Sequence, residues 1–324
     1  MKSIAFFNNK GGVGKTTLVY HIAYMMSELG HRVLVTDIDP QANISSMFLS
    51  EQGLYDKIES NQTIVEALKP LVKGTGDIKD AHVEKITESI YLLLGNLELS
   101  SFEDELSKSW GECLDKRTAE PALRKESAFF RIMQKAAQAV KADFILIDIG
   151  PNLGAINRSA MIAADYVVVP VSPDLFSLQG ILNVGKTLVE WREEWGERFK
   201  KNPEPTLKLP NGTMKPIGYI MSQHGVKESR PVKAYSNWAE RIPTSYRKAV
   251  LYEVAPQNTT IENDSNCLAL LKHYRSLMPM AMEVNKPIFL LRPADGAIGA
   301  HFQAVQRAKE DFEQLTKKII ARAI

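Results

Sequence analysis

The stretch NNKGGVGKTTL, residues 8–18, has the composition of a phosphate-binding loop, but it carries two lysines where such a loop needs one. Its glycines adopt backbone angles that side chains disfavour, which lets consecutive N–H groups turn toward one anion. Lys15 supplies a charge for the β- and γ-phosphates, and the Thr16 hydroxyl suits Mg²⁺. We therefore predict that the nucleotide-binding residues of this loop are Gly11, Gly12, Val13, Gly14, Lys15, Thr16 and Thr17.

The residues on either side of the loop have the pattern of a βαβ unit. Residues 3–7 (SIAFF) are an apolar run typical of a short buried strand, and apolar residues recur at helical spacing from Leu18 to Leu29. Residues 33–36 (VLVT) indicate a second strand. Strand, glycine loop, helix and strand in this order form the unit in which a helix N-terminus binds phosphate, so we expect an α/β fold.

The additional lysine, Lys10, stands five residues before Lys15. From the residues alone, Lys10 could lie on the surface near the phosphates or reach the phosphates bound by a second copy of the chain. The segment KGGVGKTT, residues 10–17, resembles the deviant Walker A motif of the ParA/MinD ATPases. In that family the early lysine crosses the dimer interface to the partner's nucleotide. The resemblance therefore implies a homodimer formed with ATP, in which Lys10 is a catalytic and nucleotide-binding residue.

Two further motifs resemble the same family and supply carboxylates. VLVTDIDPQAN, residues 33–43, ends a strand with Asp37 and Asp39, whose side chains point to the same side of an extended segment. The carboxyl ends of strands are where open α/β sheets bind ligands. The resemblance implies that Asp39 orients the attacking water and that Asp37 supports the Mg²⁺ shell. ADFILIDIGPNLG, residues 142–154, places Asp148 where a Walker B carboxylate holds Mg²⁺ through water.

The loop after Asp148 departs from the family pattern. The family has Asp-x-Pro-Pro, whereas this chain has Gly150 in place of the first proline, which predicts a more mobile loop. The resemblance implies a P-loop NTPase fold with a mostly parallel, twisted sheet and helices on both faces. It is strongest for short, Soj-like ParA proteins, because we expect no helix–turn–helix before the first strand. Weaker matches follow at residues 164–181, 217–224 and 286–305, the second of which precedes a loop that lines the base pocket.

Length and composition favour one large domain. The chain has 324 residues, of which 44% are hydrophobic, and it lacks repeats and Pro/Ser-rich linkers. We therefore expect a single ATPase domain over residues 1–324. Residues 50–140 are polar, helical in pattern and without a recognisable motif, which predicts a helical insertion there.

The cysteines and the apolar runs restrict the protein class. Cys113 and Cys267 lie in unrelated contexts, which suits a reducing cytoplasm, and neither is close in sequence to Asp148. This position argues against the iron–sulfur relatives that share the deviant Walker A loop. The first apolar run ends at Asn8, which is too short for a signal peptide. No apolar run approaches the length of a membrane span, so we expect a cytoplasmic protein.

The C-terminal segment bears on a membrane alternative, because MinD-type relatives end in a basic amphipathic helix that binds membranes. Apolar residues continue one helical stripe from Phe302 to Ile319. A terminal helix that packs on the core explains this stripe most simply, and a membrane-binding helix is the alternative.

A DNA-binding surface would have to be local, since the formal net charge is only +2. The resemblance implies that the ATP-bound dimer binds double-stranded DNA without sequence preference. The basic residues expected near that face are Arg192, Lys227, Arg230, Lys233, Arg247 and Lys248.

Three functions remain open from the sequence. The first is an ATP- and Mg²⁺-dependent dimerising switch that binds DNA, associates with the nucleoid, hydrolyses ATP slowly until a ParB-like activator acts, and partitions DNA or another cargo, as in plasmid segregation. The second is a MinD-like positioning ATPase on a membrane, which would bind liposomes instead of DNA. The third is an ATP-dependent metabolic synthase on the same scaffold, which would turn over rapidly without an activator.

Overall fold

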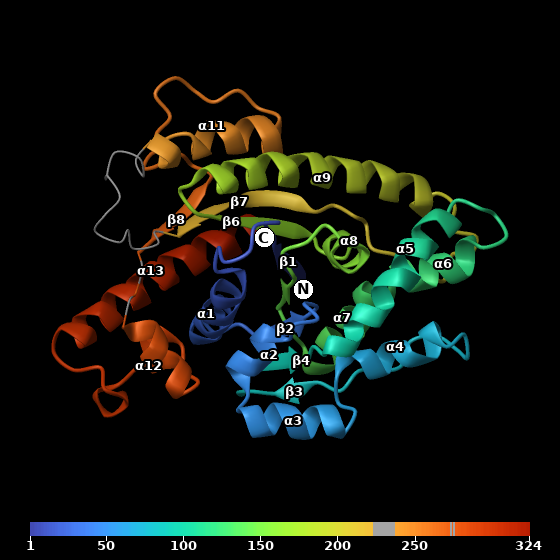
Figure 1. The fold of residues 1–324 in the computed structure, drawn as a ribbon, viewed down its shortest axis with the longest axis horizontal. Helices are drawn as coiled ribbons and strands as arrows, with labels where there is room; N and C mark the ends of the chain where they lie inside the picture. The colour runs from blue at the N-terminus through green and yellow to red at the C-terminus, as the bar shows by residue number, and fades with distance from the viewer. Residues whose placement is uncertain (223–236, 273, 275) are drawn as a thin grey trace.

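The computed structural model describes residues 1–222, 237–272, 274 and 276–324. Its centre is an eight-stranded sheet in the order β3-β4-β2-β5-β1-β6-β7-β8 (Figure 1). Neighbouring strands run parallel except for the β3–β4 pair. The strands are β1 (Lys2–Phe6), β2 (Val33–Asp37), β3 (Glu84–Lys85), β4 (Ile90–Leu93), β5 (Phe144–Asp148), β6 (Tyr166–Val171), β7 (Lys215–Ser222) and β8 (Cys267–Leu271).

Helices cover both faces of the sheet, because successive strand residues point to opposite sides and both sides are apolar. Ile145 and Ile147 join one core with the helices α4 to α9, whereas Phe144 and Leu146 join the other with α1, α2, α12 and α13. The helices are α1 (Lys15–Glu28), α2 (Asn43–Phe48), α3 (Glu51–Glu59), α4 (Ile64–Val72), α5 (Phe102–Glu112), α6 (Ala119–Glu126), α7 (Ala128–Val140), α8 (Ala155–Ile162), α9 (Leu175–Phe199), α11 (Ile242–Tyr246), α12 (Leu277–Glu283) and α13 (Ala300–Ala323). The predicted fold class is confirmed.

The stretch 50–140 is not entirely helical, which corrects the sequence prediction in that respect. Helices α3 to α7 lie within it, but so does β4, which pairs in parallel with β2 and places Ile90 opposite Val33. Part of the stretch is therefore an integral strand of the sheet. Four apolar residues are too few to reveal their period, so only their place in the sheet distinguishes them from a helical turn.

The C-terminal helix α13 packs on the core through its apolar stripe. Val305, Phe312, Leu315 and Ile319 are buried against the face that also holds α1, whereas Phe302 is 45% exposed. The predicted packing therefore holds for four of the five stripe positions, and Phe302 is the exception. Within the described residues, none of the helices combines the length and the apolar character that crossing a membrane requires.

Candidate nucleotide-binding site

The glycine loop joins the carboxyl end of β1 to the start of α1. Gly12 and Gly14 have φ angles of +74° and +83°, in the left-handed region that glycine adopts readily, whereas Gly11 does not. Helix α1 begins at Lys15 with neither a side-chain cap nor an acidic residue in its first turn. Its N–H groups are therefore free to bind an anion at the positive end of the helix.

Lys15 lies inside the loop, as a phosphate-binding lysine should. Its Nζ donates to the backbone oxygens of Asn8, at 3.1 Å, and Lys10, at 3.4 Å, and the residue is only 7% exposed. Burial lowers the pKa of Lys15, while the charges of Asp148 and Asp39 act in the opposite direction. The ammonium group therefore sits within the electrostatic field of both predicted carboxylates.

Lys10 is held away from the interior of the loop by an acid that the sequence prediction missed. Its Nζ lies 2.5 Å from Asp174 Oδ2 and 3.4 Å from Ser177 Oγ, and its side chain is 27% exposed. Asp174 is also the N-cap of α9, because its Oδ1 accepts the N–H of Ser177. Burial alone would raise the pKa of Asp174, but Lys10 and this N–H outweigh burial and lower it. The local signal was an Asp three residues before a Ser at a helix start.

The register of the sheet brings the predicted metal carboxylates together. Asp37 at the end of β2 is directly opposite Asp148 at the end of β5, and both are fully buried. Oδ1 of Asp37 and both oxygens of Asp148 make no well-formed hydrogen bond among the described residues. Burial, followed by the charge of Asp37, raises the pKa of Asp148 well above its ordinary range. The Thr16 side chain interacts with Asp148 and acts to lower this pKa, so the buried carboxylates and Thr16 lie together where a cation would fit.

These residues fit Mg²⁺ better than a metal held by protein alone. Over the described part of the chain, no three His, Cys, Asp or Glu side chains gather closely enough to hold an ion by themselves. Mg²⁺ typically binds through one or two carboxylates together with water and substrate phosphates. Asp37 has a second task, because its Oδ2 accepts the N–H and the hydroxyl of Ser45, at 3.0 and 2.7 Å. Half of its carboxylate therefore anchors the start of α2.

Asp39 lies beside the same carboxylates, on the loop that leaves β2. It is 7% exposed, and its Oδ1 accepts the N–H of Gln41 at 3.0 Å. The loop after β5 passes against it, since a Cβ added to Gly150 would lie 3.4 Å from Asp39 Oδ1. The Gly150 carbonyl accepts Nδ2 of Asn157 at 2.9 Å. The mobility expected at Gly150 stays a prediction, and the Asn157 side chain of α8 is hydrogen-bonded to the Gly150 backbone.

A cavity of about 170 Å³ adjoins the loop and suits part of a nucleotide. Its lining includes Gly14 and Thr17 from the loop and α1, Ser222 at the end of β7, and Leu271 and Lys272 at the end of β8. Of the segment 217–224, Ser222 lines this cavity, and residues 223–236, which begin the loop predicted to line the base pocket, lie outside the described part of the chain.

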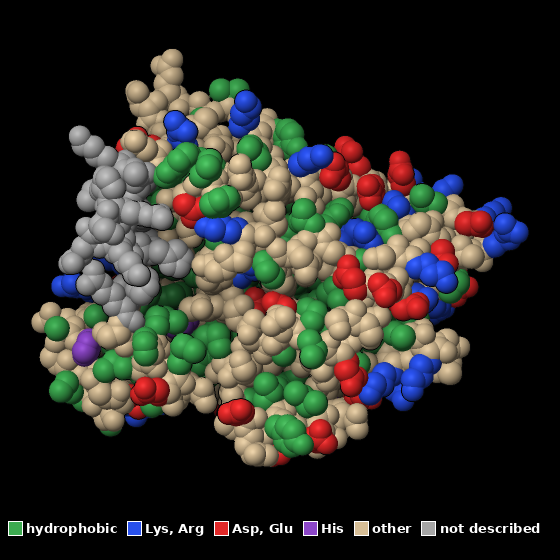
Figure 2. All heavy atoms as spheres, in the orientation of Figure 1, with side chains coloured by type: hydrophobic (Ala, Val, Ile, Leu, Met, Phe, Trp, Pro, Cys, Tyr) green, Lys and Arg blue, Asp and Glu red, His purple; other side chains and the backbone are tan. Residues whose placement is uncertain are grey.

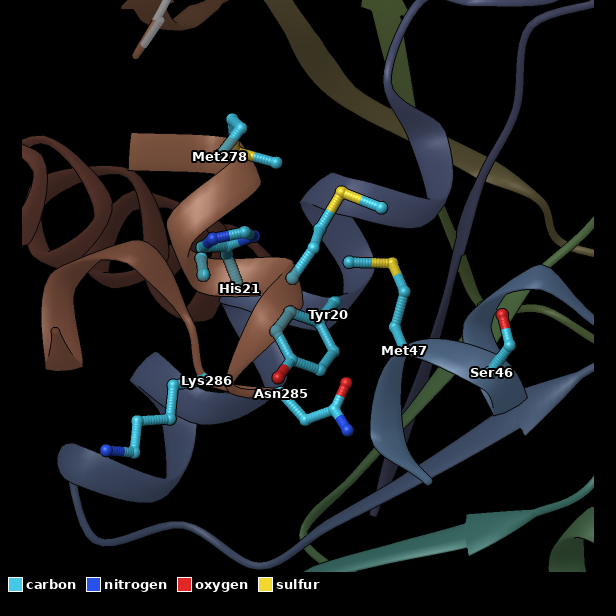
Figure 3. A pocket seen from close by; sticks show the side chains of 9 residues that line it. Tyr20, His21, Ser46, Met47, Met278, Asn285 and Lys286 are labelled. Atoms are coloured by element: carbon cyan, nitrogen blue, oxygen red, sulfur yellow. The ribbon is translucent and has the colours of Figure 1, made fainter. Parts of the chain in front are cut away.

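A neighbouring cavity of about 100 Å³ is too small for a nucleotide (Figure 3). Tyr20, Met47 and Met278 surround it, and Lys286 extends away from them to Asp295. Buried His21 separates the two cavities. Both ring nitrogens of His21 are engaged, because Nδ1–H donates to the Thr17 carbonyl and Nε2 accepts the N–H of Ile288. Burial lowers the pKa of His21 to about 4, so it is neutral at physiological pH.

The basic residues predicted to bind DNA have different surroundings. The Arg192 guanidinium donates to the carbonyls of Thr213 and Met214, and Arg247 lies 2.7 Å from buried Asp264. These contacts give both arginines a structural task. Lys248 is exposed. On the face in Figure 2, basic and acidic side chains are intermixed over α5, α6 and α9. Three of the predicted residues lie outside the described part of the chain: Lys227, Arg230 and Lys233.

Known proteins resemble this chain in sequence. Residues 1–201 match the AAA_31 family, described as an AAA domain. The sporulation initiation inhibitor protein Soj of Bacillus subtilis is 30% identical over 190 residues, which cover 58% of this chain and 64% of Soj, less than two-thirds of that protein. The chromosome partitioning protein ParA of Caulobacter vibrioides is 28% identical over 214 residues, or 64% of this chain and 67% of ParA.

Solved structures share the fold over nearly the whole chain. Apo McdA from Cyanothece has a TM-score of 0.62 and 16% identity, covering 98% of this chain and 99% of McdA. A McdA variant in complex with ATP also has a TM-score of 0.62, with 15% identity, covering 98% of this chain and 96% of McdA. The phosphate loop, the buried carboxylates, the sheet order and the sequence relatives all point to one family. The chain belongs to the ParA/MinD family of deviant Walker A ATPases.

Proposed function

We propose that this chain is a switch ATPase that dimerises with ATP, binds DNA without sequence preference in that state, and partitions or positions DNA or another cargo. The observation that carries the proposal is the placement of Lys10. The loop already contains its phosphate lysine, Lys15, while the Lys10 ammonium is partly exposed and bound to Asp174. A cation that its own site does not need is available to the phosphates of a second copy.

The residues of the site divide the chemistry among them. The N-terminus of α1 and Lys15 bind the phosphates, and Asp39 orients a water molecule for attack on the γ-phosphate. Thr16 and Asp148, with Asp37 in support, would hold Mg²⁺, which neutralises charge on the phosphate oxygens when bound. Lys10 would complete the charge around the γ-phosphate from the partner subunit. Hydrolysis therefore waits for the dimer, and an activator would accelerate it by stabilising that arrangement.

The relatives and the structure favour a protein that acts on DNA or another cargo over one that acts on a membrane. One relative is named as a chromosome partitioning protein, and the McdA complex contains ATP. The stripe of α13 that a membrane would need is largely buried against the core. We therefore propose a cytoplasmic protein that associates with the nucleoid in its ATP state and that works with a ParB-like activator.

The proposal is tested with Asp39→Ala, which removes the water-orienting carboxylate and leaves the phosphate contacts intact. We expect this variant to form a stable dimer with Mg²⁺-ATP, measured by light scattering, and a monomer with ADP. The dimer should sediment with duplex DNA of unrelated sequences, and the bound fraction should fall steeply with salt as counterions are released. A nucleotide-loaded dimer that leaves DNA in the supernatant at low salt contradicts the proposal, and its recovery on anionic liposomes would identify a membrane ATPase.

A further inference from the structure

Helix α5 contacts the start of α8, next to the loop that follows Asp148, through the carboxylate of Glu103. Its Oε1 accepts the N–H of Ala155 at 2.5 Å, and its Oε2 accepts the N–H of Ile156 at 2.9 Å. These are the first two N–H groups of α8, which has no side-chain cap of its own. Glu103 therefore caps α8 from another helix, 52 residues earlier in the chain.

The capped end of α8 follows directly on the loop that leaves Asp148. This loop comprises residues 149–154. Asn157 of α8 donates from Nδ2 to two of its carbonyls, that of Gly150 at 2.9 Å and that of Asn152 at 2.8 Å. Gly150 lies against Asp39. A continuous path of contacts therefore runs from the water-orienting carboxylate, through the loop and the first turn of α8, to Glu103.

Gly154 shows how closely the carboxylate approaches this loop. A Cβ added there would lie 2.6 Å from Oε1 of Glu103, so any side chain at this position must displace the carboxylate or the backbone. Helices α5 and α8 have a second attachment, because Arg158 lies 4.0 Å above the ring of Trp110 and donates to the Leu106 carbonyl. Removing the charge of Glu103 should therefore loosen the first turn of α8 without separating the helices.

We propose that Glu103 is a positioning residue for ATP hydrolysis: by capping α8 it holds the loop 149–154 against Asp39. This proposal rests on the proposed ATPase function and assigns a catalytic consequence to α5, within the stretch 50–140. Phosphate binding depends on the loop between β1 and α1, which Glu103 does not touch. The expected signature is slower hydrolysis with unchanged nucleotide affinity.

The test compares Glu103→Gln with Glu105→Gln in the full chain. Glutamine keeps the size of the side chain, but only one of its two terminal atoms can accept an N–H. Glu105 lies on the same helix, is also half-buried, and pairs with Lys125 instead of α8, which makes it the matched control. Glu103→Gln should lower the turnover rate at saturating Mg²⁺-ATP by about tenfold, the order expected for loss of a helix cap, and leave ATP affinity within about twofold. Amide exchange at residues 155 and 156 should accelerate in this variant alone.

Gly154→Ala provides a second approach, because it displaces the same carboxylate from the other side. It should reproduce the loss in turnover, and the double variant should lose no more than either single one. The proposal is overturned if Glu103→Gln turns over like the control, or if ATP affinity falls in parallel with the rate, which would indicate general damage. If Glu103→Gln fails to fold, a Gly154→Ala protein with normal turnover overturns the proposal equally. A wild type without ATP hydrolysis would instead refute the proposed function.

Discussion

Two lysines five residues apart have opposite surroundings in the same loop. Lys15 is nearly inaccessible and donates to backbone carbonyls, whereas Lys10 is paired with a carboxylate on a different element. A buried ammonium without a full set of partners is costly, and a phosphate would satisfy it. Lys10 already has a partner, so in the proposed dimer it would have to exchange Asp174 for the second phosphate.

Single substitutions should separate the two lysines. Lys15→Ala removes the phosphate cation and should abolish ATP binding, measured with a fluorescent nucleotide. Lys10→Ala should leave binding within a few-fold of wild type, since the Lys10 ammonium binds Asp174 and its contacts within the loop are made by the backbone, but should suppress hydrolysis and weaken the ATP-dependent dimer. Equal turnover by Lys10→Ala and wild type would contradict a role across the interface.

Asp174→Asn tests whether the intramolecular pair competes with dimerisation. Asparagine is as good an N-cap as aspartate, so α9 should keep its start while Lys10 loses its counter-charge. A partly exposed pair contributes about 0.2–1 kcal/mol, and two such pairs are released per dimer, so the midpoint concentration of the ATP-dependent dimer should fall by up to about thirtyfold. Light scattering across a dilution series measures this shift. A weaker dimer would mean that Asp174 assists the interface instead of restraining Lys10.

At the scale of elements, the long helix α9 illustrates close packing against the segment after α11. Residues 247–251 form a π-helical turn there, and a Cβ added to Gly185 would lie 1.9 Å from the carbonyl oxygen of Ala249. That separation is far inside van der Waals contact, so glycine is required at this crossing. Gly196, further along the same helix, has nothing within 4 Å of the corresponding position.

The two glycines of α9 should therefore respond to alanine with opposite signs. Gly185→Ala forces two backbones apart and should lower the free energy of unfolding by about 3 kcal/mol or more. Gly196→Ala should raise it by about 0.5–1 kcal/mol, because alanine has the higher helix propensity and nothing obstructs its methyl group. Urea denaturation of both variants measures the difference. Equal effects would show that the crossing does not pack as closely as described.

At the scale of the whole molecule, one buried acid lies where three helices, α5, α6 and α8, meet. Glu126 at the end of α6 is 1% exposed, accepts the Ser109 hydroxyl of α5 at 2.6 Å and lies 3.9 Å from Arg158 of α8. Arg158 and Arg198 of α9 lie over the ring of Trp110. Burial raises the pKa of Glu126 to about 7, although both arginines act in the opposite direction.

This raised pKa predicts the pH dependence of stability. Because the folded protein binds the Glu126 proton more tightly than the unfolded chain does, the contribution is complete below the ordinary value of 4.5 and is lost as the pH rises to about 7. In that window the free energy of unfolding of wild type should fall relative to Glu126→Gln by up to about 1.4 kcal/mol per pH unit. Urea denaturation at several pH values measures the slope, with Glu105→Gln, whose carboxylate is only partly buried, as the control. Parallel profiles for wild type and Glu126→Gln would contradict this prediction.

The sequence by itself determined the phosphate loop, the carboxylates that follow β2 and β5, and the α/β class. These features are local, because a strand, a glycine turn and a helix start are each encoded by adjacent residues. The same locality explains why the apolar stripe of α13 was predicted as a core-packed face, with Phe302 as the single exposed exception.

Only the tertiary structure decided which distant groups meet. Residues 164 positions apart form the Lys10–Asp174 pair, and the sheet order places β4 beside β2. Glu103 reads as one more surface acid on a helix until α8 is packed against α5. From the sequence, Arg192 and Arg247 look like free positive charges, but in the fold Arg192 donates to a carbonyl and Arg247 pairs with a carboxylate. Sequence spacing specifies backbone conformation over a few residues, whereas charge pairing and burial depend on contacts between elements that only the folded chain brings together.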